Sequence, residues 1–228
     1  MPIVSFVTPK GGAGKTTATV LIACGLAERG HRVAIIDTDP NQPIQSWAEK
    51  DIPPPPSITV YPNVKEVNLL DTIDTAEEHH DWVLIDGEGS ANLASSYSIA
   101  ASQFVIVPAQ KSQLDAKEAV KAIKMIQNAS RSIKADIPFR LLFMRTNASV
   151  VAGVQRAIET NFGEVEAMPV ELAERSAYQA IFAYGGSLST LPKTGAGAGN
   201  IANAQKNADA VVDAVIELSQ ALSRKVAA

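Results

Sequence analysis

The sequence predicts an α/β fold, a doubly wound and mostly parallel sheet flanked by helices. Short runs of β-branched and apolar residues recur along the chain, segments with a helical spacing of apolar residues alternate with them, and a glycine-rich loop directly follows the first run. The chain has 228 residues, of which 46% are hydrophobic, so it can bury a substantial core. It contains no evident repeat or linker, and we expect a single domain over residues 1–228.

A strand–helix–strand unit is predicted at the start of the chain. Residues 3–7 (IVSFV) and 32–37 (RVAIID) are typical of buried strands. The segment 16–28 between them is rich in Ala, Leu and Ile and ends just before Gly30, as a helix with a glycine cap does. Such units cross over in the right-handed sense, so the two strands should be parallel.

The remaining elements follow the same alternation. Strands are expected at 81–86, 104–109 and 139–144, with a short one at 164–170. Helices are expected near 64–79, 91–101, 113–133, 150–161 and 199–226. The four prolines at 53–56 predict an extended connection, because proline fixes φ and has no N–H to donate.

Charge and cysteine content exclude several classes of protein. Cys24 is the only cysteine, which excludes internal disulfides and a multi-cysteine iron–sulfur site within one chain and fits a reducing compartment. No apolar stretch approaches the roughly 20 residues of a membrane-spanning helix. Residues 1–110 contain 6 Lys and Arg against 13 Asp and Glu, whereas residues 111–228 contain 14 against 11. Any cationic surface therefore belongs to the C-terminal half.

The glycine-rich loop "VTPKGGAGKTT" predicts a phosphate site. Its glycines let successive backbone N–H groups point at phosphate oxygens, and the helix that follows adds its positive end. Lys15 would supply charge to the β- and γ-phosphates, and the Thr16 hydroxyl would bind Mg²⁺. Pro9 stands where the usual loop has its first glycine, and Lys10 is a second lysine. The candidate nucleotide-binding residues of the loop are Lys10, Gly11, Gly12, Ala13, Gly14, Lys15, Thr16 and Thr17.

This loop resembles the deviant Walker A motif of the ParA/MinD family of ATPases, whose signature is the extra lysine. The resemblance spans essentially the whole chain and is strongest at residues 3–43, 81–90 and 171–188. It implies a P-loop ATPase of slow, partner-stimulated turnover that uses ATP and Mg²⁺. It also implies a catalytic role for Lys10, which would reach across a dimer interface to the nucleotide of the other subunit. ATP would then form a sandwich dimer, and hydrolysis would dissolve it.

Acidic residues stand at the ends of two of the predicted strands. Asp37 and Asp39 are two residues apart, so in extended structure their side chains face the same side. The resemblance implies that Asp39 positions the attacking water and that Asp37 holds the hydration shell of Mg²⁺. Asn41 is an extra residue relative to the family's D-x-D-P-Q stretch. Asp86 resembles the Walker B aspartate, which reaches Mg²⁺ through water.

The second acidic stretch departs from the family. Where the family usually has D-x-P-P, this chain continues Gly87-Glu88-Gly89-Ser90, and the two glycines predict a more mobile switch. Glu88 could act as the general base, or it could have a surface or switch role. On the opposite side of the nucleotide, residues 143–147 (FMRTN) resemble the family's adenine-side stretch. Asn147 would read the base edge there, and Arg145 would pack nearby.

The predicted helix 113–133 carries a row of cations. Lys117, Lys121, Lys124 and Arg131 fall within about 80° of arc on a helix of 3.6 residues per turn. Such a stripe could contact several DNA phosphates, and dimerisation would double it. The alternative is that these lysines only solvate the outer face of an amphipathic helix.

The resemblance therefore predicts a ParA-type partition ATPase that segregates plasmid or chromosomal DNA. It would be a homodimer with ATP, bind DNA non-specifically, and act with a ParB-like centromere-binding partner. We expect it to be cytoplasmic, and nucleoid-associated in the ATP state. Because the chain starts at the first predicted strand, we expect it to resemble the small ParA proteins that lack the N-terminal DNA-binding extension.

Three other functions are alternatives. A related ATPase could position a conjugation, secretion or other complex at the cell pole with the same core. A MinD-like protein would bind membranes through its tail, but residues 211–228 carry only Arg224 and Lys225 as cations and no aromatic anchor, so we expect a packing helix. A metabolic P-loop ligase would lack the second lysine. The chain predicts no membrane span.

Overall fold

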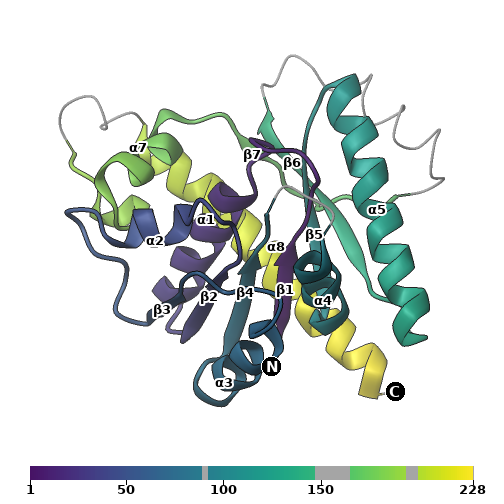
Figure 1. The fold of residues 1–228 in the computed structure, drawn as a ribbon. Coiled ribbons are helices and arrows are strands. Elements are labelled where there is room, and N and C mark those ends of the chain that lie inside the picture. The colour runs from purple at the N-terminus through teal and green to yellow at the C-terminus, as the bar shows by residue number, and fades with distance from the viewer. Residues whose placement is uncertain (89–91, 147–164, 194–199, 228) are drawn as a thin grey trace.

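Seven parallel strands form one sheet, in the order β3-β2-β4-β1-β5-β6-β7 (Figure 1). The computed structural model describes residues 1–88, 92–146, 165–193 and 200–227. The strands are β1 (Ile3–Phe6), β2 (Val33–Asp37), β3 (Ile58–Tyr61), β4 (Trp82–Asp86), β5 (Phe104–Gln110), β6 (Phe139–Thr146) and β7 (Leu172–Ala173). The predicted doubly wound, parallel sheet is confirmed.

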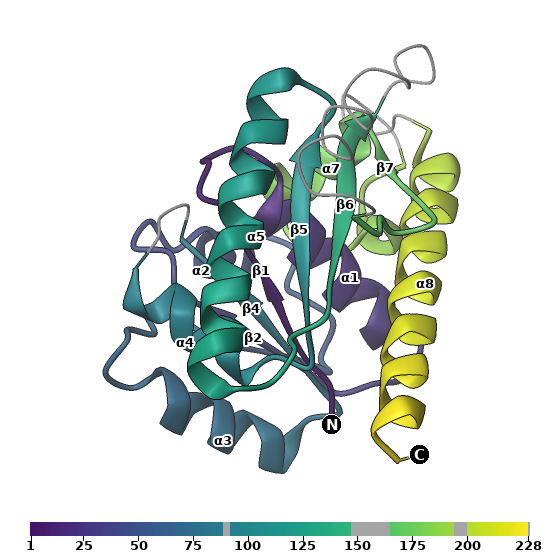
Figure 2. The same cartoon turned by 90° about the vertical axis from the view of Figure 1, so that its right-hand side faces the viewer.

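Helices cover both faces of this sheet (Figure 2). One face carries α1 (Lys15–Glu28), α2 (Pro43–Ala48), α7 (Ser176–Tyr184), the short 3₁₀ helix η1 (Leu188–Thr190) and α8 (Ile201–Ala227). The other face carries α3 (Leu69–His79), α4 (Leu93–Ala101) and α5 (Gln113–Ile133). The predicted helix at 150–161 lies outside the described residues.

The central strands are buried on both faces, which explains why their sequences are continuous apolar runs. Along β5, Phe104 and Ile106 pack with α1 and α8, whereas Val105 and Val107 pack with α5. Successive side chains of a strand point to opposite faces, so a strand between two helix layers needs apolar residues at every position.

Two features of the sheet differ from the prediction. Residues 58–61 form the edge strand β3, which the sequence did not predict, because only one side of an edge strand pairs and its residues here are half-buried or exposed. The strand predicted at 164–170 is wrong. Its described residues, 165–170, make a single bridge, between Ala167 and Leu141, and Pro169 has no N–H to extend it. The strand at this edge is β7 instead.

The sheet places the ends of its central strands side by side. Because β1 lies between β4 and β5, the loops that follow these parallel strands meet at one edge of the sheet. The connection from β1 runs through α1 on one face, and the connection from β4 runs through α4 on the other (Figures 1 and 2). A crevice at this reversal of direction is where open α/β sheets bind ligands.

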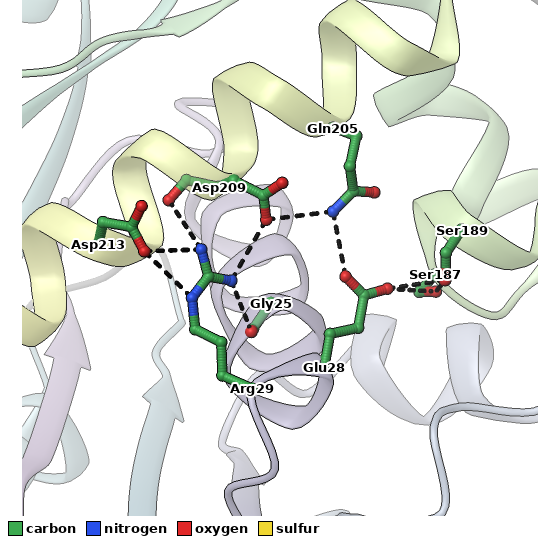
Figure 3. Close-up of polar contacts among 8 residues, drawn as sticks. All are labelled: Gly25, Glu28, Arg29, Ser187, Ser189, Gln205, Asp209 and Asp213. Carbon is green, nitrogen blue, oxygen red and sulfur yellow. Dashed lines mark hydrogen bonds and ion pairs between the residues drawn. The ribbon is translucent and has the colours of Figure 1, made fainter.

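A polar clasp fixes the far end of α1 to α8 (Figure 3). The guanidinium of Arg29 donates to Asp213 Oδ1 at 2.7 Å and to Asp209 Oδ1 at 3.2 Å, and it also reaches the Gly25 carbonyl at 2.9 Å. Glu28 accepts hydrogen bonds from three side chains, those of Ser187, Ser189 and Gln205. The helix that starts at the glycine-rich loop is thereby held at its opposite end.

The C-terminal helix α8 packs against the core as predicted. Ala204, Val211, Val212 and Val215 are all buried, and together they cover α1. Gly25 allows the close approach, since a Cβ at that position would lie 2.5 Å from Val212 Cγ2. None of the described helices combines the length and the apolar character that crossing a bilayer requires.

Candidate nucleotide-binding site

The glycine-rich loop between β1 and α1 has the conformation that only glycine adopts without strain. Gly12 has φ 75° and Gly14 has φ 105°, both in the left-handed region. Gly14 is the N-cap of α1, so no side chain occupies the first free N–H groups of that helix. A negatively charged group would find these donors and the positive end of a 14-residue helix at the same place.

The predicted phosphate lysine is folded into the loop. Lys15 is buried, and its Nζ donates to the carbonyl oxygens of Thr8 at 3.3 Å and Lys10 at 3.4 Å. Burial lowers the pKa of Lys15, while the charges of Asp86, Asp39 and Glu88 oppose this shift. Weak carbonyl partners and nearby carboxylates leave this ammonium ready to exchange its contacts for phosphate oxygens.

The second lysine contacts a different element of its own chain. Lys10 Nζ lies 3.0 Å from Oδ1 of Asp115, a buried residue in the first turn of α5. A further contact ties the loop to this region, since Gln110 at the end of β5 donates from Nε2 to the Gly12 carbonyl at 3.2 Å. Lys10 therefore lies at the mouth of the loop, as the sequence predicted, and points toward α5.

A hydroxyl and a carboxylate meet behind the loop. Thr16 Oγ1 donates to Asp86 Oδ2 at 2.7 Å, and Thr19 Oγ1 donates to the other oxygen at 3.3 Å. Asp86 pairs in register with Asp37 on the adjacent strand β2. Burial, with a smaller contribution from the charge of Asp37, raises the pKa of Asp86 to about 7, while the hydrogen bond from Thr16 opposes the rise. A divalent cation beside such a carboxylate would offset the cost of its burial.

The oxygen donors fit Mg²⁺ rather than a metal that needs a full protein cage. Mg²⁺ is usually held by one or two carboxylates, waters and substrate phosphates. Thr16 and Asp86 supply that kind of partial set. Within the part of the chain that the structure describes, no group of three or more His, Cys, Asp and Glu residues could hold a metal by itself.

Asp37 has a structural partner that the sequence did not reveal. Its Oδ2 accepts from the backbone N–H of Ile44 at 3.0 Å, at the start of α2, and its Oδ1 accepts from the N–H of Asp39 at 3.1 Å. Burial raises the pKa of this carboxyl, and these backbone hydrogen bonds oppose the rise. Asp37 therefore anchors the loop that carries Asp39, and its predicted contact with the Mg²⁺ hydration shell stays a prediction.

The extra residue Asn41 closes the turn around Asp39. Its backbone N–H and its Nδ2 both donate to Asp39 Oδ1, at 2.8 and 3.0 Å. Gln42 follows with φ 50° and donates from Nε2 to the Asp39 carbonyl at 2.7 Å. Asn41 thus holds the Asp39 carboxylate through one of its two oxygens. The charge of this carboxylate is close enough to raise the pKa of Lys15 against the effect of burial.

The stretch after Asp86, where the sequence departs from the family pattern, is described by the structure as far as Glu88. Glu88 Oε2 accepts from Nδ2 of Asn92, the N-cap residue of α4, at 2.8 Å. Its charge also acts on Lys15, so the carboxylate lies near the loop. Gly89 and Ser90 lie outside the described residues.

A cavity of about 250 Å³ opens beside the loop and supplies a second part of the site. It is lined by Gly14, Thr17, Met144, Arg145, Leu172, Ala173, Glu174, Arg175, Tyr178, Gln179 and Phe182. The predicted Arg145 is among these residues, whereas Asn147 lies outside the described part of the chain. The sequence reasoning missed Tyr178, Gln179 and Phe182, although their i, i+1, i+4 spacing on one helix face within 171–188 was a usable signal.

A larger hollow of about 1060 Å³ lies away from the loop. It is lined by residues at the end of α5, the start of β6 and the end of α8, including Ile126, Arg131, Phe139 and Leu222. None of the residues of the glycine-rich loop lines it. The volume of a hollow therefore does not identify the candidate nucleotide site.

The predicted basic stripe is exposed along α5. Lys117, Lys121, Lys124 and Arg131 are all exposed, whereas Ala116, Ala119, Ile123 and Ile126 are buried against the sheet. One member of the stripe has a partner on the same helix, because Lys121 Nζ lies 2.8 Å from Glu118 Oε1. The amphipathic orientation is confirmed, and contact with DNA stays a prediction.

Together, the parallel sheet, the two-lysine loop between β1 and α1, and the aspartate that ends β4 define a P-loop protein of the ParA/MinD ATPase class. Its membership can be stated more closely. The chain belongs to the VirC1 protein family, whose model matches residues 1–228.

Two relatives from Rhizobium radiobacter match most of the chain. Protein ParA is 31% identical over 225 residues, which cover 97% of this chain and 100% of ParA. Protein virC1 is 30% identical over 186 residues, which cover 79% of this chain and 80% of virC1.

Solved structures of McdA share the fold. Cyanothece McdA matches with a TM-score of 0.76 without nucleotide and 0.74 as an ATP complex, at 16% identity and over 94% of this chain. The matches cover 99% and 96% of McdA. In Halothiobacillus neapolitanus, the maintenance of carboxysome distribution protein A is 26% identical over 202 residues, which cover 85% of this chain and 89% of that protein.

Proposed function

We propose that this protein is a ParA-type partition ATPase that hydrolyses ATP to ADP and phosphate and acts as an ATP-dependent sandwich dimer. The observation that carries the proposal is the pair of lysines in one loop. Lys15 is buried within the loop, whereas Lys10 lies at its mouth with its side chain 31% exposed. One lysine suffices to bind phosphate in its own subunit. The second lysine is therefore available to bind a nucleotide in another subunit.

Different residues of the site would carry out different parts of ATP hydrolysis. The N–H groups of residues 11–17 and the Lys15 ammonium would bind the phosphates. Thr16 and Asp86 would hold Mg²⁺, which supplies charge stabilisation for the transferring phosphoryl group. The free oxygen of the Asp39 carboxylate would orient the attacking water, while Asn41 holds the other oxygen. Lys10 would add charge to the same phosphoryl group from the partner subunit.

The cavity beside Gly14 is the site that we assign to the base of ATP. It opens directly from the phosphate loop and offers apolar surface from Met144 and Phe182. Polar side chains at its rim, Arg145 and Gln179, can meet the ring edge or the ribose. This combination of an apolar slot and a few polar groups is typical of small-molecule sites.

The cargo that we propose is plasmid or chromosomal DNA, and the ATP dimer would also bind DNA non-specifically. The exposed cations of α5 form a row that a dimer would double, and each can contact a phosphate without reading sequence. A ParB-like protein would stimulate hydrolysis and so release the dimer. The ATP state would then be bound to the nucleoid in the cytoplasm.

A second candidate function is the positioning of a complex other than DNA, for example a conjugation or secretion complex at the cell pole. It is favoured by one of the relatives, which is named for the distribution of carboxysomes. The same ATP-dependent dimer would serve this function, with a different cargo.

Binding to random-sequence duplex DNA tests the first proposal. The protein would be measured with ATP, with ADP and without nucleotide, over a salt series, beside Lys10→Ala and the control Lys65→Ala, an exposed lysine outside the loop. We expect salt-sensitive binding with ATP alone, lost in Lys10→Ala and kept in Lys65→Ala. ATP hydrolysis without DNA binding in any state would favour the second candidate. Binding to anionic vesicles would instead favour a membrane function.

A further inference from the structure

The contact between Lys10 and Asp115 joins two segments that are 105 residues apart in the chain. Lys10 comes from the mouth of the phosphate loop, and Asp115 comes from the first turn of α5. The Nζ–Oδ1 distance is 3.0 Å, and the two side chains are 31% and 4% exposed. A pair with one member so deeply buried is screened much less than a surface ion pair.

Asp115 has few other partners for its charge. Ser112, the N-cap residue of α5, donates from its hydroxyl to Asp115 Oδ2 and accepts from the Asp115 backbone N–H at 3.1 Å. The positive end of the helix also favours a carboxylate in this turn. Lys10 is the one full positive charge that the structure places against Asp115 among its described residues. If Lys10 leaves, a carboxylate that is buried in the fold loses its counter-ion, and this is costly.

The conformations of the two loop lysines are also linked. Lys15 Nζ donates to the backbone carbonyl of Lys10, the residue whose side chain reaches Asp115. A phosphate that draws Lys15 away would remove one of the contacts that hold the backbone at Lys10. The loop is tied to the end of β5 by the Gln110 contact as well, only five residues before Asp115.

We propose that Asp115 is a positioning residue for Lys10. It holds the ammonium in its own subunit while no nucleotide is bound, and Lys10 must leave it to reach the nucleotide of a partner subunit. The strength of this contact therefore sets how much ATP is needed for dimerisation. The inference rests on the proposed function, because it requires that Lys10 acts across a dimer interface.

Asp115→Asn tests the proposal, since asparagine keeps the shape and an oxygen acceptor but removes the charge. Dimerisation would be measured by sedimentation across an ATP titration. We expect the variant to dimerise at about fivefold lower ATP, because removing a partly buried ion pair favours the released lysine by a factor of this order. The turnover number of the saturated dimer should not change, because Lys10 is still delivered.

Three variants separate this role from a structural one. Lys10→Ala should not dimerise with ATP, and adding Asp115→Asn to it should not restore the dimer. Ser112→Ala weakens the start of α5 but leaves the ion pair, so it should not lower the ATP requirement. Glu118→Gln removes a charge from the same helix, where it pairs with Lys121, and should have no effect. Dimerisation of the Lys10→Ala, Asp115→Asn double variant, or a shift of Asp115→Asn alone to higher ATP, would overturn the proposal.

A second measurement addresses the contact without ATP. The nucleotide-free protein would be treated with a limiting amine-acylating reagent, and modification of Lys10 would be compared with that of Lys117 by mass spectrometry. We expect Lys10 to react several-fold faster in Asp115→Asn than in the unsubstituted protein, because the carboxylate no longer holds its ammonium. Equal rates would show that Asp115 does not hold Lys10. If the contact is present but saturating ATP produces no dimer, the proposed function fails, and the role of Asp115 fails with it.

Discussion

Thr16 Oγ1, on the first turn of α1, lies 2.7 Å from Asp86 Oδ2, at the end of β4. The contact brings the loop that would hold phosphate to the carboxylate that would hold its cation. Asp86 is almost fully buried, so the protein maintains a carboxylate where it is costly to ionise. A cation such as Mg²⁺ beside this carboxylate would offset that cost.

Removing the hydroxyl should therefore abolish most ATP turnover. We expect Thr16→Ala to lower the turnover number by about 100-fold, because one preorganised ligand of the phosphoryl-transfer site is lost. Thr16→Ser keeps the hydroxyl and should retain most activity. The measurement is ATP hydrolysis over a Mg²⁺ titration. Equal activity of the alanine and serine variants would remove Thr16 from the site.

The pH dependence of stability should report on Asp86. Its pKa is raised to about 7, whereas an aspartate in an unfolded chain titrates near about pH 4. Between these values the folded state retains a proton that the unfolded state has lost, so the free energy of unfolding falls as pH rises through this window.

Asp86→Asn should remove this dependence. In the absence of nucleotide, we expect the variant to be more stable than the unsubstituted protein at about pH 8, by on the order of 2–4 kcal/mol, and similar to it at about pH 4. Chemical unfolding at a series of pH values measures the difference. Parallel stability curves for the two proteins would contradict the assignment. The Mg²⁺ affinity of the unsubstituted protein should fall as pH drops below about 7, since the cation competes with a proton.

The loop offers a matched pair of glycines for testing its conformation. Gly12 has a φ of 75°, whereas Gly11 has no positive φ, and an added Cβ would meet nothing within 4 Å at either position. Gly12→Ala should therefore destabilise the protein by about 1–2 kcal/mol through backbone strain alone. Gly11→Ala should leave the free energy of unfolding nearly unchanged, because Gly11 is not in the left-handed region. Urea unfolding of the nucleotide-free variants gives both values, and equal losses would mean that the loop does not need its left-handed turn.

Local patterns in the sequence predicted the parts of the site that lie within one segment. The alternation of strands and helices predicted the sheet, and the glycine spacing predicted the loop, because backbone geometry alone determines both. The carboxyl ends of parallel strands share one edge of a sheet, so the sequence alone is enough to assign Asp37 and Asp86 to the same edge.

Contacts between distant segments could not be predicted in this way. The partner of Lys10 lies 105 residues away on α5, and nothing in the sequence around Asp115 marks it as an ion-pair residue. Asp37 was predicted to face Mg²⁺, yet its oxygens also accept from the start of α2, a six-residue helix with little sequence signal. The edge strand β3 was missed for a similar reason, since half-buried residues give no clear period.

The clasp between α1 and α8 should stabilise the fold without contributing to catalysis (Figure 3). Arg29 is 26% exposed in its side chain and contacts both Asp209 and Asp213. We expect Arg29→Met, which keeps the apolar stem, to lower the free energy of unfolding by about 1–2 kcal/mol, with a smaller loss for Asp213→Asn, whose side chain is 60% exposed. The affinity for ATP should not change. Urea unfolding and nucleotide titration would be compared, and an ATP defect at unchanged stability would contradict a structural role.

The base site can be tested separately from the phosphate loop. Phe182 lines the cavity beside Gly14, and an apolar ring there can pack against a nucleotide base but has no means of binding phosphate. We expect Phe182→Ala to weaken ATP binding by about threefold to tenfold. This factor corresponds to the binding free energy that one aromatic contact contributes. Binding of inorganic triphosphate, which has no base, should be unchanged. If both ligands weaken equally, the substitution acts through the fold. If neither weakens, the base lies elsewhere.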